Sequence, residues 1–376
     1  MTRVVWCVTS PVTVRAFLRE QVAYLKKFGI TPTVISADDG EIAQEVPRFV
    51  PWRIEREPSA GADARALKDL TSTLRQEAPE VIVVGTPKAS LLGMLSAVAA
   101  RVPRRIYVVH GLRFEGFVGW RRRAMQSVEV LIATLATDVV AVSPSVAGKL
   151  RALLPRRVAA KVRVLRHGSA DGIDAARFFP ADAQERSALR RRLGLPEDAH
   201  VVVFIGRLTA DKGLSALCSV ADRLHKSAED AVLVVIGELD TRSETEIREV
   251  TELLAAPSVR HVERTSEAEA WLRAADVVAQ PTRREGMPNV VLEAQFSGVP
   301  VVSCAVTGVI DAIEDDVSGV LVPWGQDEEF SDAVLALLAD PDRRRRLAET
   351  ALARARERFD QTALRDAWAD LLLEGT

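Results

Sequence analysis

The sequence lacks the segments that carry a protein into or across a membrane. No apolar run approaches the roughly 18 residues that a membrane-spanning helix needs, and Met1, Thr2 and Arg3 lead directly into a short apolar stretch at 4–9. That stretch is too short for a signal peptide and is typical of a buried strand. We therefore expect a cytoplasmic protein.

Cysteine is scarce, with 3 residues in a chain of 376. Cys7, Cys218 and Cys304 are far apart in apolar surroundings and have neither metal-ligand spacing nor the pattern of a disulfide framework. Their placement predicts buried thiols in a reducing compartment. We expect no metal site and no cofactor.

Two recognition motifs are also missing. The first predicted strand is not followed by a G-x-G-x-x-G turn, which argues against a dehydrogenase that binds a dinucleotide. No nucleic-acid recognition module is present, which argues against nucleic acid as a partner. No repeat of solenoid length is visible either.

The charge of the chain is unevenly distributed. Residues 1–165 contain 25 Lys and Arg against 14 Asp and Glu, a net charge of +11, and the remainder carries −13. Arginines at 113 and 121–123 alternate with aromatic residues at 114, 117 and 120. Such a surface could contact an anionic membrane or a phosphate-bearing acceptor, or could simply be a solvated basic face.

The first part of the chain alternates apolar strands with amphipathic helices, which predicts a doubly wound α/β domain. Expected strands lie at 4–9, 33–36, 81–85, 105–109 and 139–142, and expected helices at 17–28, 64–77 and 91–100. In a parallel sheet, ligands bind beyond the carboxyl ends of the strands. The loops that follow the strands therefore share one edge, and their polar residues Thr13, Lys88, His110 and Arg113 are candidates for contact with an acceptor.

A chain of this length exceeds the usual size of one hydrophobic core, so two domains are expected. The boundary is placed near 163–179. This gives a first domain at 1–165, a second at 166–358 and a terminal helical segment at 359–376.

The second domain opens with a predicted strand at 201–205, followed at once by Gly206, Arg207, Lys212 and Gly213. A helix is expected at 214–226. Cations at the start of a helix oppose its dipole, so a structural role explains them poorly. A pyrophosphate whose developing charge must be neutralised explains them better, although a solvated surface remains the alternative.

The most informative stretch is 276–302. It predicts a strand at 277–279, a loop, and a helix that begins at Pro288, because proline suits a first helical position. The backbone N–H groups of Gly286, Met287 and Asn289 would be available to a phosphate at this helix start. Glu285 precedes the helix and Glu293 lies eight residues later, inside it. Alone, two such glutamates could equally be solvated surface residues.

The order of these elements resembles the retaining glycosyltransferases of family 4, which have the GT-B architecture. The matching elements are the Gly-Arg-x-x-x-x-Lys-Gly segment at 206–213, Glu285 with Glu293, and the linker residues Gly172, Asp174, Phe178 and Pro180. The resemblance implies two Rossmann-like domains facing across a cleft, with a terminal helix that crosses back to the first domain.

The same resemblance implies a role for each candidate residue. Glu285 would hold the donor sugar, Glu293 the ribose, and Arg207 with Lys212 the leaving phosphate. His110 would orient a sugar, and Arg264 lies in the loop that would contact the nucleobase. The chain departs from the family in lacking a glycine pair at 10–15 and a glycine at 263–265.

The resemblance therefore implies a metal-independent, retaining transfer from a nucleotide sugar, with UDP as the expected nucleotide, to an acceptor hydroxyl. The loops at 84–93 and 109–116 resemble those of bacterial enzymes that build surface polysaccharides on lipid carriers at the inner face of the membrane. Two alternatives are a natural-product glycosyltransferase with a small soluble acceptor and a non-catalytic nucleotide-binding subunit.

Overall fold

The computed structural model describes residues 2–55, 59–227, 230–241 and 243–374. The chain divides into two compact units. Unit 1 consists of Met1–Gly172 with Gln361–Thr376, and unit 2 of Ile173–Asp360. The division falls after Gly172 rather than after 165, because residues 166–172 fold against unit 1, where Ser169 N–H donates to Val142 O.

Unit 1 is built on a parallel sheet of seven strands in the order β3-β2-β1-β4-β5-β6-β7. The strands are β1 Val4–Cys7, β2 Thr33–Ser36, β3 Phe49–Pro51, β4 Val81–Val84, β5 Arg104–Val109, β6 Asp138–Ala141 and β7 Val162–Arg163. The central strands are buried on both faces, as expected where helices cover the two sides of a parallel sheet.

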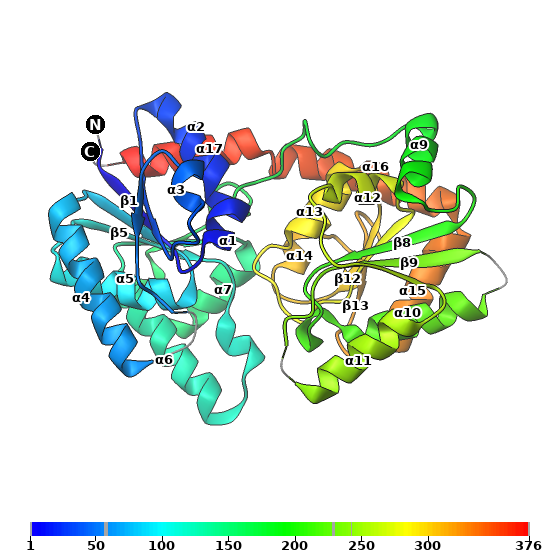
Figure 1. Ribbon diagram of the computed structural model, residues 1–376, viewed down its shortest axis with the longest axis horizontal. Helices are drawn as coiled ribbons and strands as arrows, with labels where there is room; N and C mark the ends of the chain where they lie inside the picture. Colours follow the sequence, from blue (N-terminus) through cyan, green and yellow to red (C-terminus); the bar gives the residue numbers. More distant parts are fainter. Residues whose placement is uncertain (1, 56–58, 228–229, 242, 375–376) are drawn as a thin grey trace. The chain divides into compact units, whose positions relative to one another are not determined.

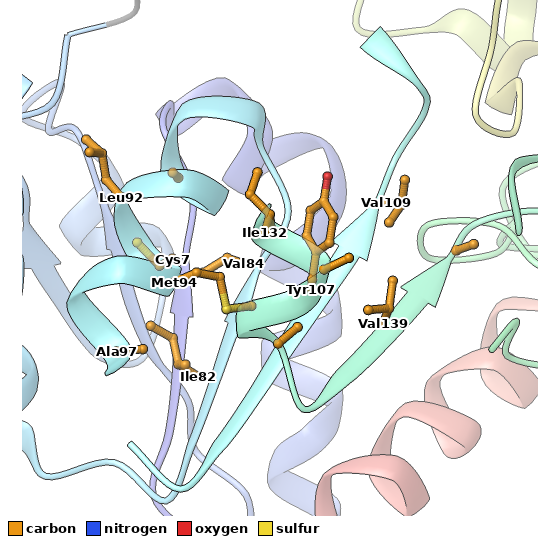
Figure 2. Close-up of a cluster of buried hydrophobic side chains, with 14 of the residues drawn as sticks. Cys7, Ile82, Val84, Leu92, Met94, Ala97, Tyr107, Val109, Ile132 and Val139 are labelled. Carbon is orange, nitrogen blue, oxygen red and sulfur yellow. The ribbon is translucent and has the colours of Figure 1, made fainter. Parts of the chain in front are cut away.

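One face of this sheet carries the helices α4 Ala60–Glu77, α5 Pro87–Ala99, α6 Gly119–Leu135 and α7 Pro144–Leu153. Figure 2 shows the centre of this core, where Met94 and Leu92 of α5 and Ile132 of α6 lie over side chains of β1, β4, β5 and β6. Tyr107 is buried there because its hydroxyl donates to Glu129 Oε2 at 2.7 Å. Burial raises the pKa of Glu129.

The opposite face is covered by α2 Arg19–Leu25 and by the terminal helix α17 Gln361–Leu373. Trp368 of α17 packs on Trp6 of β1, with ring centroids 5.2 Å apart. Arg365 of α17 is buried and forms a double hydrogen bond with Asp171, at 2.9 and 2.6 Å. These contacts join the last helix of the chain to unit 1.

The start of unit 1 corrects one sequence prediction, since residues 11–15, expected in the loop after the first strand, are helical. The helix begins at α1 Pro11–Thr13, continues through the wider π turn η1 Val14–Leu18 into α2, and ends in η2 Lys26–Phe28. Ser10 is the N-cap residue, and its side chain accepts from Val12 N–H. A serine cap followed by proline favours a helix start.

Unit 2 has a six-stranded parallel sheet in the order β10-β9-β8-β11-β12-β13. The strands are β8 His200–Ile205, β9 Ala231–Ile236, β10 Val259–Val262, β11 Val277–Gln280, β12 Val301–Cys304 and β13 Val320–Val322. The predicted fold class is confirmed, because each unit is a doubly wound parallel sheet.

Helices cover both faces of the second sheet (Figure 1). One face carries α10 Leu214–Lys226, α11 Glu244–Ala255 and α15 Asp327–Ala339; the other carries α9 Ala183–Leu193, α12 Ala268–Ala274, α13 Asn289–Phe296 and α16 Pro341–Arg358. α9 starts at a capping box in which Asp182 and Glu185 satisfy each other's backbone N–H groups.

The remaining short elements are α3 Ile42–Glu45, α8 Arg156–Ala159, α14 Val309–Ala312, and the 3-10 turns η3 Arg113–Gly116 and η4 Ala210–Lys212. Within the described residues, no helix is long and apolar enough to cross a membrane.

Candidate active site

The candidate donor site lies at the topological switch point of the second sheet, between β8 and β11. β8 and β11 are neighbours in the sheet, but the helices that follow them, α10 and α13, cover opposite faces. The loops beyond these two strands therefore separate and leave the crevice in which doubly wound proteins bind ligands. The two segments that resemble the family's donor-binding elements, 206–213 and 281–288, are these loops.

Lys212 and Glu285 meet at this point. Lys212 Nζ lies 2.5 Å from Glu285 Oε1, and the two side chains are 15% and 17% exposed. Thr282 Oγ1 donates to the same carboxylate oxygen at 2.8 Å. The predicted cation and carboxylate are thus brought into direct contact, and a lysine and a threonine fix the orientation of Glu285.

A second set of contacts joins the two loops and was not predicted from the sequence. Arg283 N–H donates to Asp211 O at 2.9 Å, and Arg284 Nη2 lies 3.3 Å from Asp211 Oδ2. Thr209 Oγ1 lies 2.6 Å from the other carboxylate oxygen of Asp211. Burial alone would raise the pKa of Asp211, but the hydrogen bond from Thr209 and nearby cations lower it on balance. Asp211 therefore stays ionised and ties the loops together.

Gly213 and Gly308 allow the backbones to approach closely around Glu285. Gly213 has φ +76°, and a Cβ there would lie 1.9 Å from Pro281 O. Gly308 has φ +81°, and a Cβ there would lie 2.4 Å from Gly286 O. Glu285 N–H also donates to Thr307 O at 3.3 Å. The 305–308 loop thus supports the backbone that carries Glu285.

The start of α13 differs slightly from the prediction. Pro288 is the N-cap residue, with an extended ψ of 100°, and the helix begins at Asn289. The carbonyl oxygen of Pro288 accepts hydrogen bonds from Val291 N–H and Leu292 N–H. In the part of the chain that the structure describes, the N–H groups of Gly286, Met287 and Asn289 make no hydrogen bond, so they are available to an anion.

Glu293 lies in the middle of α13 and is half-buried. Burial raises the pKa of its carboxyl group to about 7, with nearby Glu269 adding to the rise and Arg177 opposing it. Its carboxylate accepts no hydrogen bond from any described residue. Arg177 is instead bonded to Glu269, at 2.8 Å. Within the described parts of the chain, Glu293 is therefore a carboxyl group without a hydrogen-bond partner.

The remaining predicted donor residues, Arg207 and Arg264, pair with acids that follow β9. Arg207 Nη1 lies 2.6 Å from Asp240 Oδ2, and Arg264 lies 2.7 Å from Glu238 Oε1. Both arginines are more than half exposed. Gly206 follows β8, and a Cβ at the neighbouring Gly237 would lie 1.8 Å from Gly206 O. The acidic partners could not be identified from sequence spacing.

A hollow of about 430 Å³ lies beside the Arg264 loop. Its lining includes Glu238 after β9, and His261 and Glu263 from β10 and the residue after it. A second hollow of about 270 Å³ includes His200 and Ala231, at the amino ends of β8 and β9. That hollow lies at the wrong edge of the sheet for a donor site.

Unit 1 has its own switch point, between β1 and β4. Thr9 N–H donates to Thr86 Oγ1 at 2.9 Å, and this bond joins the residues that follow the two strands. His110 follows β5 at the same edge and stacks on Phe17, with centroids 5.8 Å apart and planes at 29°. Burial lowers the pKa of His110 to about 4, so its imidazole is neutral near pH 7.

Because Gly85 has no side chain, the imidazole of His110 can lie against the end of β4. A Cβ at Gly85 would lie 2.7 Å from His110 Nε2. The side chain of His110 is therefore confined between Phe17 and the end of β4. This position was predicted as an acceptor-side residue, and its contact with Gly85 was not.

The other three acceptor-side candidates have different surroundings. Thr13 lies in the first helical turn and is partly buried, and Arg113 is exposed on η3. Lys88 lies in the first turn of α5, 13% exposed, with its Nζ 2.5 Å from Asp63 Oδ1 and 2.8 Å from Glu55 O. Its ammonium group is therefore held within unit 1 by other residues.

No group of three or more His, Cys, Asp or Glu side chains suited to a metal ion is present among the described residues. The groups of the candidate donor site that could bind an anion are Lys212, Arg207 and the backbone N–H groups before α13.

Comparison with known proteins gives matches over both units. Residues 185–354 match the family model described as glycosyl transferases group 1, and residues 14–169 match the model described as glycosyltransferase family 4. The capsular polysaccharide biosynthesis glycosyltransferase CapM of Staphylococcus aureus is 27% identical over 94% of this chain and 92% of its own. A D-inositol 3-phosphate glycosyltransferase of Catenulispora acidiphila is 32% identical over 86% and 79%.

Among solved structures, HepE of Anabaena, crystallised with UDP and glucose, is similar with a TM-score of 0.82. It is 21% identical to this chain, and the match covers 99% of each. At that identity the likeness shows the fold.

Proposed function

Because the chain belongs to glycosyltransferase family 4 and has its GT-B fold, we propose that it transfers a sugar from a nucleoside diphosphate sugar to an acceptor hydroxyl. The observation that carries this proposal is the contact between Lys212 and Glu285 at the switch point of unit 2. A cation for the leaving phosphate and a carboxylate for the sugar hydroxyls then lie within hydrogen-bonding distance of each other.

In the proposed reaction the bond between the anomeric carbon and the phosphate oxygen breaks while the acceptor oxygen forms its bond to the same carbon. Negative charge grows on the departing diphosphate. Lys212 and the free N–H groups of Gly286, Met287 and Asn289 would stabilise that charge. Arg207, which is exposed, would exchange Asp240 for the diphosphate.

Two carboxylates would bind the rest of the donor. Glu285, oriented by Thr282 and Lys212, would accept hydrogen bonds from sugar hydroxyls. Glu293, which has no protein partner among the described residues, would accept them from the ribose. His110 is neutral near pH 7 and would orient a sugar through hydrogen bonding rather than remove a proton.

We further propose that the configuration at the anomeric carbon is retained, through attack on the face from which the diphosphate leaves. The leaving phosphate would take the acceptor proton, so no side-chain base is needed. Proton NMR of the first product formed from an α-linked donor tests this directly, since an α product supports retention and a β product contradicts it.

Lys212 and Arg207 would also supply the charge neutralisation for which other transferases use a divalent cation. We therefore propose that turnover is independent of metal. Activity that disappears in excess EDTA and returns with Mg²⁺ or Mn²⁺ would contradict this.

UDP is the proposed nucleotide, supported by the HepE structures that contain UDP or UDP-glucose. The base would lie near Arg264 and the hollow lined by Glu238, His261 and Glu263. A thermal-shift series with UDP, GDP and ADP tests the assignment, because a ligand that binds only the folded protein raises its Tm. Stabilisation by UDP alone is expected.

For the acceptor we propose a lipid-linked or polysaccharide intermediate, supported by the similarity to CapM. The second candidate is a small soluble phosphorylated polyol, favoured by relatives named D-inositol 3-phosphate glycosyltransferases. Turnover of a soluble polyol phosphate without lipid would favour the second candidate. Nucleotide binding with no turnover of either acceptor would indicate a non-catalytic subunit.

A further inference from the structure

The start of α6 exposes both apolar and basic side chains. We call residues 118–123 the α6 tip. Val118 is 79% exposed and Trp120 is 75% exposed, the two highest values among the large exposed hydrophobic residues of the described chain. Arg121, Arg122 and Arg123 follow directly and are all exposed. Exposing a tryptophan to this degree leaves its apolar surface in water, which folding alone does not favour.

The arginines of the α6 tip form no ion pair with any acid that the structure describes. Within the described residues, Arg121 and Arg122 lie only over aromatic rings, those of Trp120 at 5.7 Å and Phe114 at 5.9 Å. Some other arginines of unit 1 are paired with acids, as Arg15 is with Asp39 and Glu45, and Arg104 with Asp138. No described acid therefore compensates the positive charge at the tip.

The neighbouring sequence contains little negative charge. Between 116 and 170 the acidic residues are Glu129 and Asp138. Glu129 is buried against Tyr107, and Asp138 is bonded to Arg104 and Arg163. The first turn of α6 also contains no acidic residue, although acids are favoured there. Glu115, three positions before the tip, is paired with Lys149 and 14% exposed, so the acids nearest the tip in sequence are buried or bonded to cations.

We propose that the α6 tip binds the surface of an anionic phospholipid bilayer, with Trp120 and Val118 inserted at the headgroup level and the three arginines against lipid phosphates. A tryptophan beside cations is suited to this boundary, because the ring is amphipathic and the guanidinium groups bind phosphate in pairs of hydrogen bonds. The lipid surface accounts for both features at once, whereas a solvated basic face accounts only for the arginines. This inference goes beyond the transfer reaction and does not depend on the identity of the donor or acceptor.

Vesicle co-sedimentation of the full chain tests the proposal without any turnover. Vesicles of phosphatidylcholine with about one-third phosphatidylglycerol should bind the protein, and pure phosphatidylcholine should bind it weakly. Trp120→Ala should lower the partition coefficient roughly tenfold. Replacing Arg121, Arg122 and Arg123 with Gln should lower it by about fivefold per charge, and raising the salt should weaken the binding of the wild type.

Unit 2 offers matched controls. Trp324→Ala removes a tryptophan that is 37% exposed, and the triple change of Arg345, Arg346 and Arg356 to Gln removes three exposed arginines of α16. Both should bind anionic vesicles as the wild type does. Equal binding by the α6-tip variants and the wild type would overturn the proposal. So would concentration-dependent self-association that Trp120→Ala abolishes in a protein that binds no vesicles.

Discussion

Lys212 and Glu285 form an ion pair of 2.5 Å although they are 73 positions apart in the sequence. Each lies beyond the carboxyl end of a strand, Lys212 after β8 and Glu285 after β11, and these strands are neighbours at the switch point of the second sheet. The fold therefore places a cation and a carboxylate together at the edge where a doubly wound sheet binds its ligand.

Lys212→Ala should reduce turnover strongly while the protein stays folded. The lysine would stabilise charge that develops on the leaving phosphate, and removing one such group costs about 10² to 10³ in kcat. The measurement is steady-state kinetics with a saturating donor, together with Tm and circular dichroism as checks of the fold. Lys226→Ala is the matched control, because that lysine is 71% exposed at the far end of α10. An unchanged kcat for Lys212→Ala would contradict the proposed role of Lys212 in stabilising the leaving phosphate.

Donor affinity should rise with pH through about 7 because of Glu293. Burial raises the pKa of this carboxyl to about 7, so at pH 6 it is mostly protonated and poorly able to accept hydrogen bonds from ribose hydroxyls. Titration calorimetry with donor at pH 6 and pH 8 tests this. Glu293→Gln should bind donor weakly at both values. Glu349→Gln, an exposed change on α16, should keep the pH dependence.

The same group should affect stability in the opposite direction in the absence of ligand. Between its ordinary pKa of 4.5 and about 7, the folded chain holds a proton that the unfolded chain has lost. The free energy of unfolding therefore falls as the pH rises through this window, by up to about 1.4 kcal/mol for each pH unit. The slope of Tm against pH in this window should be smaller in Glu293→Gln.

Much of the fold could be predicted from the sequence, because strong local patterns carry it. Apolar runs bounded by glycine and proline identified strands such as β8 and β11, and the Gly206 to Gly213 segment marked the loop between β8 and α10. The helix at Pro11 was missed although its signal was present, since Ser10 followed by proline is a cap and a first turn. The resemblance to the family's first loop had favoured a loop there instead.

The contacts within the site could not be predicted in the same way, because they join residues that are distant in the sequence. Nothing near Arg207 or Arg264 indicates that Asp240 and Glu238 would pair with them. Lys88 shows the same limit in unit 1, since its ion pair with Asp63 depends on how α4 and α5 pack. Local spacing identifies which residues follow strands, and packing decides which partners they meet.

Gly85→Ala should displace the side chain of His110 while leaving the imidazole itself unchanged. The added Cβ would lie 2.7 Å from His110 Nε2, so the imidazole must move from its position on Phe17. If His110 orients a sugar, kcat/KM should fall by one to two orders of magnitude, as displacements of about 1 Å can cause. Gly148→Ala is the control, since nothing lies within 4 Å of its added Cβ. Normal kinetics in both Gly85→Ala and His110→Ala would show that His110 has no such role.

Gly308→Ala should weaken donor binding through the backbone that carries Glu285. Gly308 has φ +81°, and an added Cβ would lie 2.4 Å from Gly286 O and 2.9 Å from Glu285 O. Backbone atoms cannot rotate away as a side chain can, so the 285–286 segment must shift.

Gly325→Ala is the control for backbone strain alone. Gly325 has φ +88°, but nothing lies within 4 Å of an added Cβ. Both alanine variants should lose about 1–2 kcal/mol of stability from a left-handed non-glycine residue. Only Gly308→Ala should also raise KM for the donor, measured by initial rates at fixed acceptor. Equal KM values for the two variants would mean that the 305–308 loop does not position Glu285.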